Sequence, residues 1–166
     1  IEPFIQEIFQ GISKGRESIH ISYVPSFQPG NSVQETAALF VKELERTVSS
    51  DVRSGFTITG PHRDDIEIQI NGVSARVYGS QGQQRSAVLA MKLAEARILE
   101  ECTGEAPIVL LDDVLSELDK ERQDYLLNHL HDQQVFITCC EPDTVDIMKT
   151  GMRFRVESGI IYPEEA

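Results

Sequence analysis

The chain has 166 residues, of which 40% are hydrophobic, so it can bury a core as one domain or as two small lobes. It carries 27 acidic and 15 basic residues, and this net charge of −12 predicts weak DNA binding, with any basic surface confined to a local patch or to another part of a longer protein. No apolar run reaches membrane-spanning length, no signal peptide is visible, and the three cysteines lack zinc-site or disulfide spacing, which is typical of a cytoplasmic protein.

The N-terminal elements follow from the spacing of apolar residues. Residues 3–12 place them on one stripe of a helix, residues 18–24 alternate as a strand, and residues 32–49 return to helical spacing. Because the chain starts at Ile1 inside a helical pattern and without Met, we expect it to be a piece of a longer protein. The second helix should bury Val33, Ala37, Phe40, Val41, Leu44 and Val48.

Three strands are predicted in the middle of the chain. Residues 55–59 alternate between apolar and polar side chains, and residues 66–70 do the same. Asn71-Gly72 is the favoured pair for a two-residue hairpin turn, which would lead into a third strand over residues 73–77.

The loop between the first two of these strands, Gly-Pro-His-Arg-Asp-Asp at 60–65, has two interpretations. Arg63 could reach a phosphate or a partner subunit, because a guanidinium makes strong charge-assisted hydrogen bonds. Alternatively, Arg63 could hold the loop together by pairing with Asp64 or Asp65. The residues alone leave both open.

The C-terminal elements alternate between helix and strand. Residues 81–102 predict a long helix, 108–111 a buried strand, 120–130 a second helix and 134–139 a second buried strand beside the first. Residues 153–162 predict a hairpin that closes the sheet. We expect the long helix to bury Val88, Met91, Ala94, Ile98 and Cys102, with Leu89 and Leu99 beside them.

A polar turn of small residues opens the long helix. Ser80 is a good N-cap, and Gly79 and Gly82 let backbone amides approach a ligand without an intervening Cβ. A helix N-terminus carries unpaired N–H groups and partial positive charge, so a phosphate could bind there. Taken alone, the pattern is also what an ordinary helix cap looks like.

Two acids follow the first buried strand. Asp112 could hold Mg²⁺, because hard cations take oxygen ligands, and Asp113 could orient or deprotonate an attacking water. Phospho-acceptor proteins and other metal-dependent α/β proteins also end strands in aspartates, so this element by itself indicates only a Mg²⁺ or phosphate site.

The order in which these motifs occur identifies a protein family more specifically than the polar turn or the acid pair does alone. The turn Tyr-Gly-Ser-Gln-Gly-Gln-Gln-Arg at 78–85, the strand ending in Asp112-Asp113, and Ser-Glu-Leu-Asp at 116–119 resemble the signature motif, Walker B and D-loop of ABC-type ATPases. The residues that make up these motifs, together with the loop at 60–65, resemble the RecF family of DNA repair ATPases, and the resemblance covers nearly the whole chain.

The resemblance implies an α/β fold, the C-terminal half of an ABC-type P-loop ATPase head. Residues 1–103 would form a helical and β lobe that carries the signature motif, lobe II, without its N-terminal part. Residues 104–166 would form the Walker B and D-loop part of lobe I, and the boundary between the lobes is soft.

The resemblance also implies roles for individual residues and partners for the parent protein. Asp112 would bind Mg²⁺ and Asp113 would be catalytic, while the residues that contact ATP across a homodimer would be Ser80, Gln81, Gly82, Gln83 and Asp119. ATP would join two copies on DNA, and hydrolysis would release them. Recombination mediator proteins such as RecR are the further partners implied.

Two features limit the expected activity. No glycine of the chain lies in a Gly-x-x-x-x-Gly-Lys-Ser/Thr phosphate loop, so we expect negligible ATPase activity from these residues alone. Cys139-Cys140-Glu141 stands where ABC proteins commonly carry a switch histidine, which favours slow turnover in the parent. The alternatives are a non-enzymatic acidic interaction module, an SMC-like chromosome-organising ATPase and, more remotely, a transporter subunit.

Overall fold

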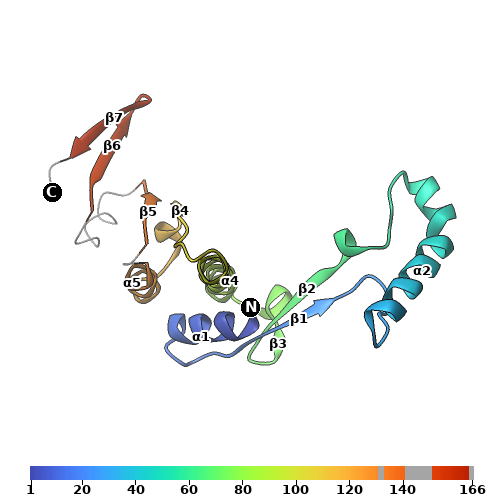
Figure 1. The fold of residues 1–166 in the computed structure, drawn as a ribbon. Helices are drawn as coiled ribbons and strands as arrows, with labels where there is room; N and C mark the ends of the chain where they lie inside the picture. The colour runs from blue at the N-terminus through green and yellow to red at the C-terminus, as the bar shows by residue number, and fades with distance from the viewer. Residues whose placement is uncertain (131–132, 141–150, 165–166) are drawn as a thin grey trace.

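The structure is a computed structural model that describes residues 1–130, 133–140 and 151–164. Its elements are α1 (Glu2–Ile12), β1 (Ile19–Val24), α2 (Val33–Ser54), η1 (Pro61–Arg63), β2 (Asp65–Ile70), β3 (Val73–Ser74), α3 (Ala75–Tyr78), α4 (Gln81–Thr103), β4 (Val109–Asp112), η2 (Leu115–Glu117), α5 (Lys120–His129), β5 (Val135–Thr138), β6 (Arg153–Glu157) and β7 (Ile160–Glu164). The arrangement is elongated: α1, α4 and α5 lie together in the middle, α2 lies at one end and the β6–β7 hairpin at the other (Figure 1).

The core forms where α1 packs against α4 and α5. The apolar stripe predicted for the first helix is confirmed, because Ile5, Phe9 and Ile12 are almost completely buried. On α4 the facing residues are small: Ala90 and Ala94 are fully buried, and they let α1 approach closely. The core therefore combines large side chains on α1 with a buried face of α4 that contains alanines as well as Leu89 and Leu93.

Among the described residues, the strands form three separate sheets. The first is antiparallel, with the order β1-β2-β3, and β1 and β2 form a long hairpin-like ladder in which Ile21 lies opposite Ile68. The predicted turn at Asn71-Gly72 is confirmed, since both residues have positive φ, 52° and 79°. The second sheet pairs β4 with β5 in parallel, as predicted, with Leu111 opposite Ile137. The predicted burial of these two strands was wrong in part, because Leu111 is buried but Leu110 is 74% and Phe136 is 54% exposed.

The third sheet corrects one prediction. The hairpin at the end of the chain is present as β6 and β7, with Ser158-Gly159 at its turn. However, it forms a two-stranded sheet of its own and does not close the β4–β5 sheet. Within the described ranges, no helix is long and apolar enough to cross a membrane.

One predicted strand was wrong and another was too long. Residues 55–59 form no strand, because α2 extends to Ser54 and ends at Gly55, whose φ of 75° turns the chain, while the Ile58 N–H donates to the Asp51 carboxylate at 3.0 Å. The strand expected at 73–77 stops at Ser74, and the short helix α3 follows. Residues 55–59 are thus a turn and irregular chain after α2, whereas a helix replaces the strand predicted at 75–77.

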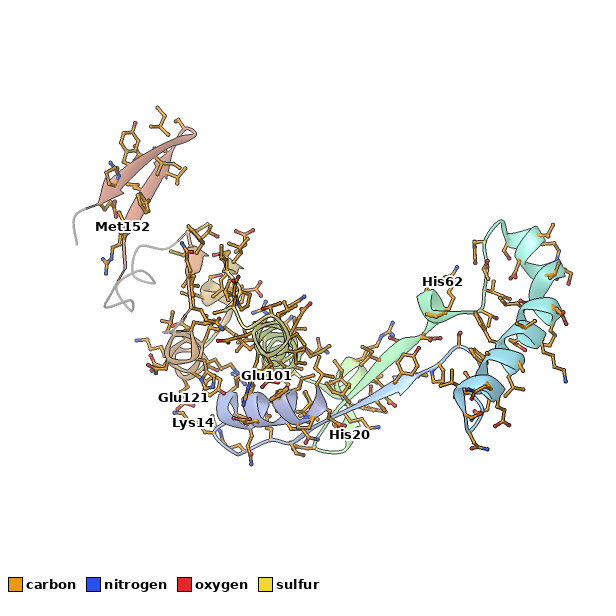
Figure 2. All side chains as sticks on the ribbon, viewed as in Figure 1. Lys14, His20, His62, Glu101, Glu121 and Met152 are labelled. Carbon is orange, nitrogen blue, oxygen red and sulfur yellow. The ribbon has the colours of Figure 1, made fainter. Side chains whose placement is uncertain are left out.

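The buried face predicted for α2 was also wrong. Thr47 is buried in α2, whereas Val33, Val41 and Val48 are 81%, 56% and 55% exposed. The reason is position: α2 lies at the end of the β1–β2 arm, far from the core helices, and most of its side chains project into solvent (Figure 2). A stacking contact between Phe40 and Phe27, with ring centroids 5.2 Å apart, supports its base.

The face predicted for α4 was wrong in part. Ala94 and Leu89 are buried as expected, but Val88 is 58% exposed, Leu99 is 48% exposed and Cys102 is exposed. The buried face of α4 instead consists of Ser86, Ala87, Leu89, Ala90, Leu93 and Ala94. Val88 and Leu99 instead line a groove of about 770 Å³ between α4 and β4.

Candidate functional site

The turn that opens α4, residues 79–83, is held by a capping box, and we call it the capped turn. The Gln83 N–H donates to Ser80 Oγ at 3.2 Å, and the Ser80 N–H donates to Gln83 Oε1 at 2.9 Å. This confirms the N-cap predicted at Ser80. Ser80 and Gln81 are exposed, so the start of the helix is open to a ligand.

The two glycines of the capped turn differ in what requires them. A Cβ on Gly79 would lie 2.4 Å from the Ala75 carbonyl oxygen, so the chain's own backbone demands a glycine there. A Cβ on Gly82 would meet only the Arg122 guanidinium at 3.5 Å, an ordinary contact distance. Nothing in the described part of this chain requires glycine at position 82.

A residue far away in the sequence fixes the Gln83 side chain. Gln83 Nε2 donates to Glu17 Oε1 at 2.6 Å, and Glu17 lies in the connection between α1 and β1. The sequence offered no signal for this pair, because 66 positions separate the residues and neither belongs to a recognisable local pattern.

The second part of the site is the turn over residues 116–119, which we call the acidic turn. Asp119 is the N-cap of α5, as predicted, and its Oδ1 accepts from the Arg122 N–H at 3.0 Å. That hydrogen bond and the charge of Arg122 hold the pKa of Asp119 below its usual value. Gln123 supports the turn from below, since its Nε2 donates to the carbonyls of Leu115 and Leu118 at 2.7 and 3.1 Å.

Arginines join the acidic turn to the capped turn. Arg122 Nε donates to Ser86 Oγ at 2.7 Å, and Ser86 Oγ donates to the Gly82 carbonyl at the same distance. In the opposite direction, Arg85 Nη1 donates to the Glu117 carbonyl at 3.0 Å. Hydrogen bonds from α4 and α5 therefore connect the two turns within a single chain.

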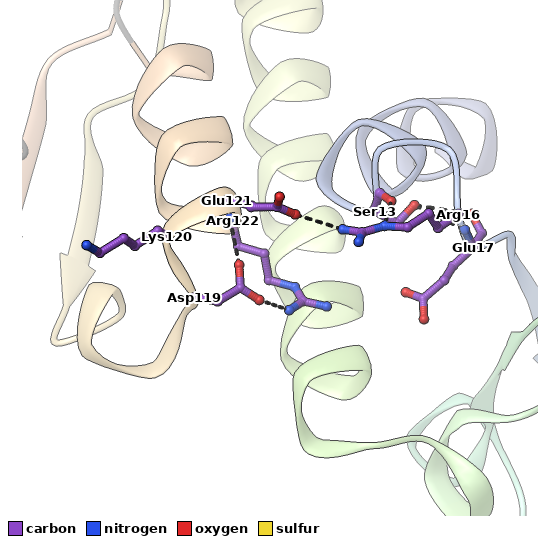
Figure 3. A pocket seen from close by; sticks show the side chains of 7 residues that line it. All are labelled: Ser13, Arg16, Glu17, Asp119, Lys120, Glu121 and Arg122. Atoms are coloured by element: carbon purple, nitrogen blue, oxygen red, sulfur yellow. Dashed lines mark hydrogen bonds and ion pairs between the residues drawn. The ribbon is translucent and has the colours of Figure 1, made fainter.

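A charged cleft of about 550 Å³ lies beside this link (Figure 3). Its lining residues are Ser13, Arg16, Glu17, Asp119, Lys120, Glu121 and Arg122. Glu121 pairs with Lys14 at 3.0 Å and with Arg16 at 2.8 Å, and Arg122 pairs with Asp119. Because acids neutralise these bases, the cleft is not the local basic patch that direct DNA binding would need.

The two acids after β4 are organised by Thr138, the last residue of β5. Thr138 Oγ1 donates to Asp112 Oδ1 at 2.5 Å and accepts from the Asp113 N–H at 3.1 Å. Asp112 ends the strand, and Asp113 has a φ of 52°, a left-handed conformation that Asp tolerates better than most residues. Both carboxylates are exposed at the carboxyl edge of the parallel sheet, as predicted.

This pair suits a hard cation in part. Carboxylate oxygens are what Mg²⁺ prefers, and Thr138 leaves the second oxygen of Asp112 available. Over the described ranges, no group of three or more His, Cys, Asp or Glu side chains could hold a metal. A cation here would need further oxygens from a ligand such as a nucleotide phosphate.

In the loop at 60–65, the predicted pairing of Arg63 with Asp64 or Asp65 is not what the structure shows. Arg63 Nε donates to the Thr57 carbonyl at 3.2 Å, and its guanidinium lies over the Phe56 ring, 4.5 Å from the centroid. Asp64 instead accepts hydrogen bonds from the Tyr23 hydroxyl and from the Ser26 N–H. The loop lies far along the β1–β2 arm, and Figure 2 places His62 well away from Glu121.

The position after β5 is only partly described. Cys139 is half-buried, and burial raises the pKa of its thiol. Glu141, the last residue of the expected switch position, lies outside the described residues.

Comparison with known proteins gives a consistent result. The chain is 43% identical to the DNA replication and repair protein RecF of Rippkaea orientalis, over 97% of this chain and 43% of that protein. It is 40% identical to the protein of the same name from Lactobacillus acidophilus, over 98% of this chain and 45% of that protein. The chain thus spans less than half the length of these relatives. No protein-family model matches it.

Solved structures agree with the sequence matches. A structure of the recombination mediator protein RecF with ATP has a TM-score of 0.78 and 35% identity, covering 99% of this chain and 43% of that chain. An SMC ATPase structure has a TM-score of 0.55 at 16% identity, which is a likeness of fold alone. These likenesses confirm the expected fold class, part of an ABC-type ATPase head.

Proposed function

Because this chain belongs to the RecF family of DNA replication and repair proteins, we propose that it supplies the signature and Walker B portions of an ATP site completed between two copies of the whole protein. In this proposal, ATP joins the copies on DNA and hydrolysis releases them. The chain covers less than half of its relatives, so the activity belongs to the whole protein rather than to these 166 residues.

The observation that carries the proposal is the unexplained glycine at position 82. It lies in the first turn of α4, directly beside an exposed N-cap, where backbone N–H groups and the helix dipole favour an anion. A γ-phosphate bound in the second copy is an occupant that needs this close approach. Ser80, Gln81, Gly82 and Gln83 would then contact that phosphate, and Asp119 would help to align the opposing site.

The acids at the end of β4 take the complementary role. Asp112 would hold Mg²⁺ together with phosphate oxygens, and Mg²⁺ would neutralise charge that develops on the phosphates. Asp113 would orient the attacking water and accept its proton. The phosphate-cradling loop has to come from another part of the protein, because this chain contains no Gly-x-x-x-x-Gly-Lys-Ser/Thr sequence.

The remaining partners follow from the same proposal. DNA would bind to a surface assembled in the dimer, since the described cleft residues are mutually neutralised and the chain is acidic overall. The protein would act in the cytoplasm, and recombination mediators such as RecR are candidate partners of the complete protein.

The test uses the whole protein with Ser80→Arg. A long cation at the N-cap should remove the capping box and repel the approaching Mg²⁺-nucleotide site, so ATP should still bind to the monomer but should no longer produce a dimer. Ser49→Arg on the exposed surface of α2 is the matched control. Light scattering or sedimentation with and without ATP measures the result, and a dimer that survives Ser80→Arg would refute the composite site.

A further inference from the structure

The Arg122 side chain lies between the two turns that the proposed function assigns to the opposing nucleotide. Its Nε donates to Ser86 Oγ at 2.7 Å, and its Nη1 pairs with the Asp119 carboxylate. Ser86 is fully buried, and its Oγ donates to the Gly82 carbonyl at 2.7 Å. One side chain therefore touches the acidic turn and, through one hydroxyl, the first turn of α4.

Arg122 is less exposed than the arginine of the other link. The Arg122 side chain is 21% exposed and that of Arg85 is 42% exposed, while their acidic partners Asp119 and Glu117 are similarly exposed, at 51% and 55%. Exposed pairs are weakened by solvent and salt, while a partly buried guanidinium with fixed donors retains its geometry. Arg122 is thus the better-defined of the two connections.

The chemistry of the link requires a guanidinium. The Nε and Nη1 donors of one planar group serve two acceptors in different directions at once. A lysine ammonium on a flexible stem lacks this fixed pair of donor directions, so we expect it to stay near Asp119 and to lose the defined hydrogen bond to Ser86. Arg122→Lys therefore cuts the connection while it keeps the charge.

We propose that Arg122 is a positioning residue that locks the acidic turn to the capped turn, so that Asp119 and the Ser80–Gln83 segment reach the second copy as one rigid unit. This inference rests on the proposed function and deepens it, because it states how two separate sequence motifs share one geometry. Arg122 acts through Asp119, Ser86 and Gly82, and it does not itself have to touch the nucleotide.

The experiment compares Arg122→Lys, Ser86→Ala and the double variant in the whole protein, with Arg97→Lys as the control. Arg97 pairs with Glu7 at 2.9 Å, away from both turns, and it offers a similarly paired guanidinium on α4. We expect each single variant to weaken the ATP-dependent dimer about tenfold, and the double variant to be no weaker than the singles, because both cut the same link. Monomer affinity for ATP should stay within about twofold of the unmodified protein.

A second measurement needs no nucleotide. Hydrogen exchange at the amides of residues 81–84 and 117–119 should become faster in Arg122→Lys and Ser86→Ala and stay unchanged in Arg97→Lys. If ATP produces no dimer of the unmodified protein, the proposed function fails, and the exchange data still decide whether Arg122 links the turns.

Two results would overturn the inference. One is unchanged dimer affinity together with unchanged exchange in Arg122→Lys. The other is a parallel loss of melting temperature, monomer ATP affinity and dimer affinity, since that would describe a general structural role. Additive losses in the double variant would equally show that Arg122 and Ser86 act separately.

Discussion

The space between Gly82 and Arg122 has room for a methyl group, because a Cβ at position 82 would lie 3.5 Å from the guanidinium, an ordinary contact distance. The α4 helix would gain from alanine there, because glycine is the poorer helix former by up to about 1 kcal/mol. The chain forgoes that gain exactly where a second molecule is proposed to approach.

Replacing Gly82 by Ala should therefore separate stability from function. We expect the free energy of unfolding to stay the same or rise, by up to about 1 kcal/mol. In the whole protein the added methyl group should weaken ATP-dependent dimerisation, by about tenfold or more. Denaturant unfolding and sedimentation with ATP measure the two effects.

Gly79→Ala is the matched comparison. Its Cβ would lie 2.4 Å from a backbone oxygen, so this variant should lose more than about 1 kcal/mol of stability through displacement of α3. If Gly79→Ala proves as stable as Gly82→Ala, the geometric distinction between the two glycines is wrong.

Asp113→Asn should stop ATP turnover without disturbing the fold. Asn tolerates the left-handed backbone at this position, and the Asp113 N–H keeps its hydrogen bonds to Thr138, so stability should change by less than about 0.5 kcal/mol. Loss of the water-activating carboxylate should lower the rate of ATP hydrolysis in the whole protein by about 10²-fold or more. The ATP-dependent dimer should persist, and an unimpaired rate would remove Asp113 from the mechanism.

The junction between β1 and the loop at 60–65 should depend on pH in both directions. Tyr23 donates to Asp64, and this bond lowers the pKa of Asp64 below 3.8 and raises the pKa of Tyr23 above 10.0. The Asp64 contribution is complete above pH 3.8 and is lost as the pH falls through the lowered pKa. The Tyr23 contribution is complete below pH 10.0 and is lost as the pH rises through the raised pKa.

Tyr23→Phe should abolish the alkaline loss and leave a reduced acid one, because the Ser26 N–H still donates to Asp64 at 2.7 Å. Hydrogen exchange of the β1 and β2 amides against pH measures this. An alkaline loss that persists in Tyr23→Phe would assign it to another group.

The core helices should carry most of the stability. Phe9 is completely buried between α1 and its neighbours, so Phe9→Ala should cost about 3–5 kcal/mol. Val41 on α2 is 56% exposed, and Val41→Ala in the 166-residue chain should change the unfolding free energy by less than about 0.5 kcal/mol. Urea denaturation of both variants tests the contrast, and equal losses would mean that α2 is packed.

Local chemistry explains what the sequence predicted well. The Ser80 and Asp119 caps, the Asn71-Gly72 turn and the parallel pairing of β4 with β5 each depend on a few adjacent residues or on a short apolar run. The order of the resulting motifs sufficed for the family and for the fold class.

Long-range packing explains what it could not predict. Nothing local reveals that α2 lies beyond the reach of the core, that Ala90 is buried on α4 while Val88 is exposed, or that Gln83 meets Glu17. The link from Arg122 to Ser86 spans 36 positions, and a sequence pattern shows Arg122 only as an ordinary helix residue. The catalytic and binding roles of the predicted residues remain predictions for the experiments above.

The two-stranded β4–β5 sheet has a practical consequence. Leu110 and Phe136, on neighbouring strands, are 74% and 54% exposed, and among the described residues each strand pairs only with the other. Flat apolar edges of this kind recruit further strands from solution. The 166-residue chain expressed by itself should therefore tend to aggregate, and a charged substitution at Leu110 should improve its solubility.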